Sequence, residues 1–214
     1  MSLATLLVLA DGRLPSGGHA HSSGLETAVA SGRVRDVEDV DGFLRGRLAT
    51  SGLVAAVFAA ACCARTEKWS SLDHGLDART PSPALRKASR AQGRALMRAG
   101  RAMWPVRDVG RDPHHPIALG ALAAAAGLGP AEAAVAAAHG TVTGPASAAV
   151  RLLGLDPYAV HALLARLAPE CDRIAADAAS RINDPVDDLP AAGAPLLDIG
   201  AELHATWEVR LFAS

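Results

Sequence analysis

Histidine and cysteine are the side chains of this sequence best suited to binding a metal ion, and they occur in three close groups. The groups are His19 with His21, Cys62 with Cys63, and His114 with His115. Imidazole and thiolate suit borderline metals such as nickel and zinc. No group has the CxxC or HExxH spacing that puts two ligands on one side of a metal, since adjacent helical residues point about 100° apart. We therefore predict no stable metal site, with His19, His21, Cys62 and Cys63 as weak candidates.

Other kinds of catalytic chemistry have no support in the sequence. There is no GxxxxGK[ST] phosphate loop, and no GxGxxG follows a strand. Ser22 and Ser23 lie in no GxSxG elbow. We therefore predict a protein that is not an enzyme. The alternative kept open is a helical protein that itself holds nickel or zinc through its histidines and cysteines.

The stretch Leu14–Glu26, LPSGGHAHSSGLE, is the most unusual part of the chain. Proline fixes one backbone angle and removes a donor, whereas glycine permits a positive φ and a close approach of backbones. One interpretation is a turn between two helices, which such residues favour. The other is a specific surface against which later helices or a partner pack.

Arginines recur every fourth residue between positions 83 and 100, at Arg86, Arg90, Arg94 and Arg98. This spacing places them in one stripe along a helix. The stripe is either a solvated face or a surface for an acidic protein. Nucleic acid is not expected, because no aromatic residues are interleaved and the formal net charge is −1.

The sequence ends on Arg210-Leu211-Phe212-Ala213-Ser214. The apolar side chains of Leu211 and Phe212 either pack into the protein or bind a partner, because exposing both to water is unfavourable. The sequence favours neither alternative.

Composition sets the class of protein. Half of the 214 residues are apolar and only 3% are aromatic, so alanine, leucine and valine must build the core. This vocabulary predicts an all-α bundle of about eight to ten helices in a single domain, 1–214. Three cysteines fit a reducing cytosol and no disulfide framework. The N-terminus lacks the basic segment of a secretory signal and the apolar runs are too short to span a bilayer, so we expect a cytoplasmic protein without membrane contact.

Capping residues, prolines and apolar periodicity place the helices. We assign no helix to the polar stretch 67–77, a loop to 103–112 and a linker to 184–195. The predicted helices are 2–10, 22–31, 36–65 with a break at Ser51-Gly52, 83–100, 114–127, 130–153 interrupted at Gly140 and Gly144-Pro145, 157–181 and 196–209.

Four stretches, in this order, resemble the pattern of the urease accessory protein F family (UreF). They are Leu14–Glu26 preceded by Ala10-Asp11; Ala88–Arg94; His114-His115-Pro116 followed by Ser147–Leu152 and Gly154; and Asp198-Ile199 with His204 and Arg210–Ser214. The pattern differs at His19, where the family often has Phe or Tyr, at Leu155-Asp156, where a Gln is usual, and at Ala205, where a Glu follows the histidine. These departures concern partner surfaces more than family membership.

The resemblance implies a non-enzymatic scaffold for nickel insertion into apo-urease. It implies that the chain bridges the D-type accessory protein (H-type in some organisms) and the GTPase accessory protein G, regulates the GTPase and forms a homodimer. No cofactor is then bound stably, although nickel is expected to pass through the complex. It assigns the C-terminal segment to the D-type partner and Arg151 to the GTPase. The partner-binding residues it implies are Gly17, Gly18, His21, Gly24, Glu26, Arg151, Arg210, Leu211 and Phe212.

Overall fold

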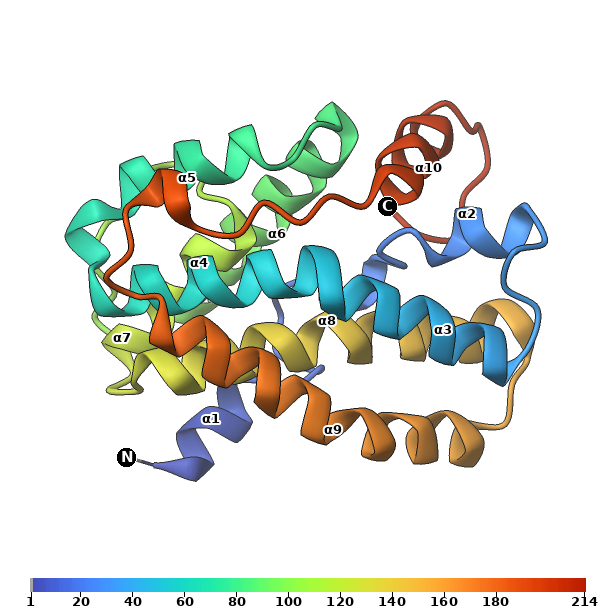
Figure 1. Cartoon of the computed structure of the whole chain (residues 1–214), viewed down its shortest axis with the longest axis horizontal. Coiled ribbons are helices and arrows are strands. Elements are labelled where there is room, and N and C mark those ends of the chain that lie inside the picture. Colours follow the sequence, from blue (N-terminus) through green and yellow to red (C-terminus); the bar gives the residue numbers. More distant parts are fainter. Residues whose placement is uncertain (1) are drawn as a thin grey trace.

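The computed structural model describes residues 2–214, so the first residue of the predicted domain lies outside them. Within that range the chain is all-α and contains no strand, which confirms the predicted fold class (Figure 1). The α-helices are α1 (Leu3–Leu9), α2 (Leu25–Ala30), α3 (Val37–Arg47), α4 (Leu53–Ala64), α5 (Trp69–Ala78), α6 (Pro83–Arg101), α7 (His115–Ala125), α8 (Pro130–Leu153), α9 (Pro157–Ser180) and α10 (Pro195–Ala205). Short 3-10 turns lie at Gly18–Ala20, Thr66–Lys68 and Val186–Asp188.

Helix α4 is the centre of the bundle. Its sequence is apolar on every side, and it packs against α7, α8 and α9. Alanine and glycine allow these helices to approach closely, and a Cβ on Gly120 of α7 would collide with the carbonyl oxygen of Ala59. The core therefore depends on small residues at helix crossings, with Phe58 as the largest fully buried side chain.

Helices α3 and α4 form one continuous rod, so the predicted break at Ser51-Gly52 is wrong. The two are joined by a π-helical turn over Leu48–Gly52. A π turn takes up an extra residue without opening the hydrogen-bonded backbone, and such turns are common at functional sites. Gly52 is required for packing rather than for chain reversal, because its Cβ position lies 3.0 Å from the Thr141 methyl group.

The combined rod Val37–Ala64 is long and apolar enough to cross a membrane by length and composition. However, 61% of its most apolar window is buried inside the fold. A central core helix satisfies the same criteria, and we interpret the rod as one.

Helix α8 also runs unbroken, contrary to the predicted interruptions at Gly140 and Gly144-Pro145. Proline has no N–H, so Pro145 cannot donate to the carbonyl of Thr141 one turn earlier. Arg47 supplies the missing donor, because its Nε lies 3.5 Å from that carbonyl oxygen. A side chain from α3 thereby compensates for the proline.

Two polar segments are more ordered than their composition indicates. The 67–77 stretch, which we assigned no helix, contains α5, whose Leu72 and Leu76 enter the core. The predicted linker 184–195 is tied down by Arg79, which donates to the carbonyls of Val186, Leu189 and Pro190 at 2.8–3.0 Å. These bonds position the start of α10, which ends at Ala205 instead of the predicted 209.

Candidate functional site

The stretch Leu14–Glu26 forms a loop with three left-handed residues. The φ angles are +76° at Gly17, +57° at Ser23 and +90° at Gly24. Glycine adopts such angles freely, whereas Ser23 is strained there. Because Ser23 and Gly24 are not helical, α2 begins at Leu25 and not at residue 22 as predicted.

The C-terminal residues dock along this loop. Ala213 N donates to the Ala20 carbonyl over 2.7 Å, and Ser22 N donates to the main-chain oxygen of Ser214 over 2.6 Å. The Ser22 hydroxyl donates to the same oxygen over 2.9 Å. His21 Nδ1 lies 2.6 Å from the Ser214 hydroxyl. We call this arrangement of loop 20–26 and residues 210–214 the tail clamp.

Glu26 is the centre of the tail clamp. Its carboxylate accepts from Leu211 N at 2.8 Å and Phe212 N at 3.1 Å, and it lies 2.8 Å from His204 Nε2 of α10. Burial alone raises the pKa of Glu26, but the backbone and His204 hydrogen bonds outweigh burial and hold its pKa below the ordinary value. The charged carboxylate therefore joins α2, α10 and the tail.

Arg151 of α8 closes the other side of the tail clamp. Its Nη2 donates to the His19 carbonyl over 2.8 Å, and its guanidinium lies 4.3 Å from the centroid of the Phe212 ring. Phe212 is 3% exposed, whereas Leu211 is 62% exposed. Of these two neighbouring tail residues, Phe212 is therefore packed into the fold and Leu211 is accessible to a partner.

The structure brings together most of the residues that the resemblance assigns to partner binding. Glu26 and Arg151 both contact Phe212, and His21 contacts Ser214 two residues further along the tail, while Arg210 is exposed. Gly24 has a packing role as well, because its Cβ position lies 3.0 Å from Leu197 of α10. Gly17 and Gly18 shape the turn that precedes the clamp. Their assignment to partner binding stays a prediction.

The four weak metal candidates are not gathered into a site. Cys62 and Cys63 are buried in α4 and donate to the carbonyls of Ile117 and Leu128. Burial raises the pKa of Cys62 to about 12 and that of Cys63 to about 11, so neither is a thiolate at neutral pH. His21 instead binds the tail through Nδ1.

Within residues 2–214, one group of three metal-type ligands has its atoms within 4.8 Å of one another: Asp73, Asp77 and His114. Arg90 already occupies this group, because its guanidinium lies 3.0 Å from Asp73 and 2.7 Å from Asp77. His114 Nε2 lies 2.9 Å from Asp77, and burial lowers the His114 pKa. We interpret the group as a structural network whose cation is arginine.

This network also explains much of the arginine stripe. Arg86, Arg90 and Arg94 lie within 4.0 Å of carboxylates of Asp77, Asp73 and Asp112. Most of the stripe therefore meets acidic residues of its own chain, an alternative that the sequence analysis did not include.

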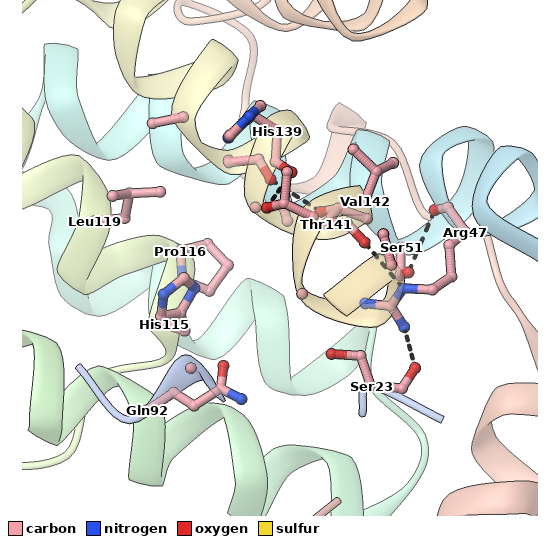
Figure 2. Close-up of a pocket in the computed structure, with 18 of the residues that line it drawn as sticks. Ser23, Arg47, Ser51, Gln92, His115, Pro116, Leu119, His139, Thr141 and Val142 are labelled. Atoms are coloured by element: carbon pink, nitrogen blue, oxygen red, sulfur yellow. Dashed lines mark hydrogen bonds between the residues drawn. The ribbon is translucent and has the colours of Figure 1, made fainter. Parts of the chain in front are cut away.

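A cavity of about 1120 Å³ lies beside the tail clamp (Figure 2). Arg47 and Ser51 from the π-turn region line one wall, and His115 of α7 and Gln92 of α6 line another. The Arg47 side chain also donates through Nη1 to the Ser23 carbonyl over 2.7 Å. The cavity is thus connected to the strained residue of the loop.

His115 should make folding sensitive to pH. Burial, with a smaller effect of His21, lowers its pKa to about 4 from 6.5. As pH falls below 6.5 the unfolded chain takes up a proton that the folded chain excludes, so stability falls. Between pH 7.5 and pH 5, the free energy of unfolding should therefore decrease by about 2 kcal/mol less in His115→Gln than in the wild-type protein. Urea unfolding at both pH values checks this, and an unchanged difference would contradict it.

These features define an all-α protein whose candidate residues hold its own loop and tail together. A profile of the UreF family matches residues 34–168, so the chain belongs to that family. A urease accessory protein UreF from Mycobacterium sp. (strain JLS) is 50% identical over 216 residues, covering 100% of this chain and 99% of the relative. Those from Mycolicibacterium vanbaalenii and Mycobacterium tuberculosis are 47% and 41% identical over the same shares of chain and relative. Such relatives are named as accessory proteins, and this chain is an accessory protein and not an enzyme.

Three contacts of the site were missing from the sequence analysis. They are the Glu26–His204 pair, the Arg47 bonds and the network around Arg90. Pro145 gave one usable signal, since a proline within a helix leaves a carbonyl that needs another donor. The other two depend on contacts between distant parts of the chain.

Proposed function

We propose that this protein is a scaffold in the cytoplasm that bridges the D-type accessory protein and the GTPase accessory protein G while nickel is inserted into apo-urease. The chain regulates the GTPase, acts as a homodimer in the assembly, and lets nickel pass through the complex without binding it stably. Family membership and the named relatives support the urease context. The observation that carries the scaffold role is the outer face of α10.

The outer face of α10 is apolar. Leu196, Ile199 and Leu203 are 64%, 66% and 53% exposed and follow helical spacing along one side. The opposite face packs on α2, where Thr27 donates to the Gly200 carbonyl over 3.3 Å. Surface helices normally bury their apolar side, so this orientation favours a protein partner. We call Leu196, Ile199 and Leu203 the α10 stripe.

We assign the α10 stripe to the D-type partner. The tail clamp joins α10 to the tail through Glu26, which contacts both His204 and Leu211 N, and the C-terminus lies beside α10 (Figure 1). The Leu211 side chain in this tail is exposed. The resemblance assigns this C-terminal part of the chain to the D-type protein. One surface therefore combines the apolar area and the segment expected to dock.

The test is a triple variant, Leu196→Ser, Ile199→Ser and Leu203→Ser. Loss of three exposed apolar contacts should weaken binding to the D-type protein on the order of 100-fold, because burying each Leu or Ile side chain contributes on the order of 1 kcal/mol and every 1.4 kcal/mol is a tenfold change in affinity. Affinity is measured by titration calorimetry. Leu3→Ser with Leu7→Ser on α1 is the control, since both side chains are 71% exposed away from α10. Wild-type affinity in the triple variant would contradict the assignment.

Arg151 is our candidate for contact with the GTPase. It is exposed although it also contacts Phe212 and the His19 carbonyl. Arg151→Ala should weaken co-purification of the GTPase at least about ten-fold. Phe212→Leu keeps an apolar tail residue but removes the ring beneath Arg151, and should retain the GTPase. Equal losses in both variants would show that Arg151 acts only through the tail clamp.

A further inference from the structure

Arg47 is a cation without an anionic partner. Among residues 2–214, no carboxylate oxygen lies within 4.0 Å of its nitrogens, whereas Arg45, two residues earlier, lies 2.8 Å from both Asp41 and Glu170. Arg47 retains some accessible surface, which faces the cavity, but the group is deep in the protein and burial lowers its pKa to about 10. Removing a charge from water without a counterion is costly, so this position needs compensation.

The hydrogen bonds of Arg47 leave donors free. A guanidinium has five N–H groups. Nε donates to the Thr141 carbonyl and one Nη1 hydrogen to the Ser23 carbonyl, which leaves the other Nη1 hydrogen and both Nη2 hydrogens without a protein acceptor. Both acceptors are neutral, so neither cancels the charge. The free hydrogens belong to the two Nη atoms, whose fork matches the paired oxygens of an oxyanion.

The surroundings add hydrogen-bond donors, and no carboxylate of the cavity wall forms an ion pair with Arg47. The Ser23 hydroxyl lines the cavity and has no hydrogen-bond partner among the described residues. The His115 ring lines the same cavity and is neutral at pH 7 because burial lowers its pKa to about 4. Four residues of the cavity wall carry a carboxyl group, namely Asp11, Asp172, Asp198 and the terminal Ser214, and all four lie beyond ion-pair distance of Arg47. The main-chain oxygen of Ser214 accepts from Ser23 N over 3.2 Å. The exposed His161 also lines the cavity, so solutes can reach it.

We propose that the Arg47 end of this cavity binds a small inorganic oxyanion of the phosphate or sulfate class. The Nη fork of Arg47 holds two oxygens of the anion and the Ser23 hydroxyl donates to a third. Since the same residues hold the loop and the α8 backbone at Pro145, the bound anion stabilises the loop that carries the tail clamp. This goes beyond the scaffold role and does not depend on it.

The experiment is a titration of the full chain with inorganic phosphate in chloride-free buffer at constant ionic strength, followed by ³¹P line broadening and calorimetry. We expect saturable binding that sulfate displaces. Arg47→Gln should weaken the affinity at least about ten-fold, the loss of a charged hydrogen-bond pair. Arg98→Gln, which removes the same charge from an exposed position of α6, should leave it unchanged. Absence of saturable binding, or equal binding by Arg47→Gln, would overturn the proposal.

A second variant tests the proposal even if Arg47→Gln fails to fold. Ser23→Gly removes the hydroxyl and relieves the left-handed strain at φ +57°, so the protein should fold at least as well as wild type. Its affinity for phosphate should be about ten-fold weaker because one hydrogen bond to the anion is lost. An unchanged affinity in folded Ser23→Gly would remove the Ser23 part of the site and overturn the geometry proposed. If a carboxylate of a partner protein is the true occupant, free phosphate will fail to saturate the site, which also overturns it.

Discussion

Glu26→Ala should detach the C-terminal tail from an otherwise folded protein. The carboxylate accepts from two tail amides and pairs with His204, so its loss leaves three donors without an acceptor, of which His204 and the Phe212 amide are buried. Breaking a buried network of this kind costs about 3 kcal/mol. Amide exchange at Leu211 and Phe212 should therefore accelerate about a hundred-fold, while exchange in α4 changes little. Hydrogen exchange followed by mass spectrometry measures both regions in one experiment.

The control is Glu38→Ala, an exposed glutamate in the first turn of α3. It should leave exchange of the tail unchanged. Acidification tests the same carboxylate in the wild-type protein: its folded pKa lies below the ordinary 4.5, so its contribution is present above pH 4.5 and is lost as pH falls through the folded pKa. A tail that stays protected in Glu26→Ala would show that the main-chain bonds to residues 20–23 suffice.

Gly120→Ala should strongly destabilise the core although it adds only a single methyl group. The new Cβ would lie 2.9 Å from the Cys62 Cβ and collide with the Ala59 carbonyl, so α7 and α4 would have to separate. Overpacking of this kind costs about 3 kcal/mol. We expect a lower urea midpoint with an unchanged slope, because the fold is retained.

Gly140→Ala is the matched opposite. Gly140 lies within α8, and its Cβ position has no atom within 4 Å. Alanine stabilises a helix interior by about 1 kcal/mol relative to glycine, so this variant should be more stable than wild type. If both variants lose stability equally, the α4–α7 crossing is not the reason for the Gly120 effect.

The sequence predicted the all-α class and most helices correctly because capping residues and apolar spacing act locally. Pro157 after Asp156 and Pro83 after Ser82 start α9 and α6 as expected. The errors at Ser51-Gly52 and Gly144-Pro145 have one physical origin, since both were read as local breaks. At Ser51-Gly52 the helix continues through a π turn. At Pro145 the side chain of Arg47, which is distant in sequence, supplies the missing donor.

In the candidate site, too, local features could be predicted from the sequence and contacts between distant residues could not. The glycines and histidines of Leu14–Glu26 marked it as an unusual segment. The order of this segment and the C-terminal motif along the chain indicated the UreF family. That Glu26 binds the tail amides, or that Arg90 joins Asp73 and Asp77, depends on residues brought together by the whole fold. One sequence without covariation holds no signal for such pairs.

The tail clamp also bears on how this protein folds. His21 and Ser214 are 193 positions apart, so their contact closes a loop of almost the entire chain. Contacts at such separation form slowly because their loop entropy must be offset by structure already in place. We expect the α4, α7 and α8 core to assemble first and the tail to dock in the last step. In a chain whose core has folded but whose tail has not yet docked, α10 would not be held in place. The α10 stripe would therefore form a binding surface only after the tail has docked.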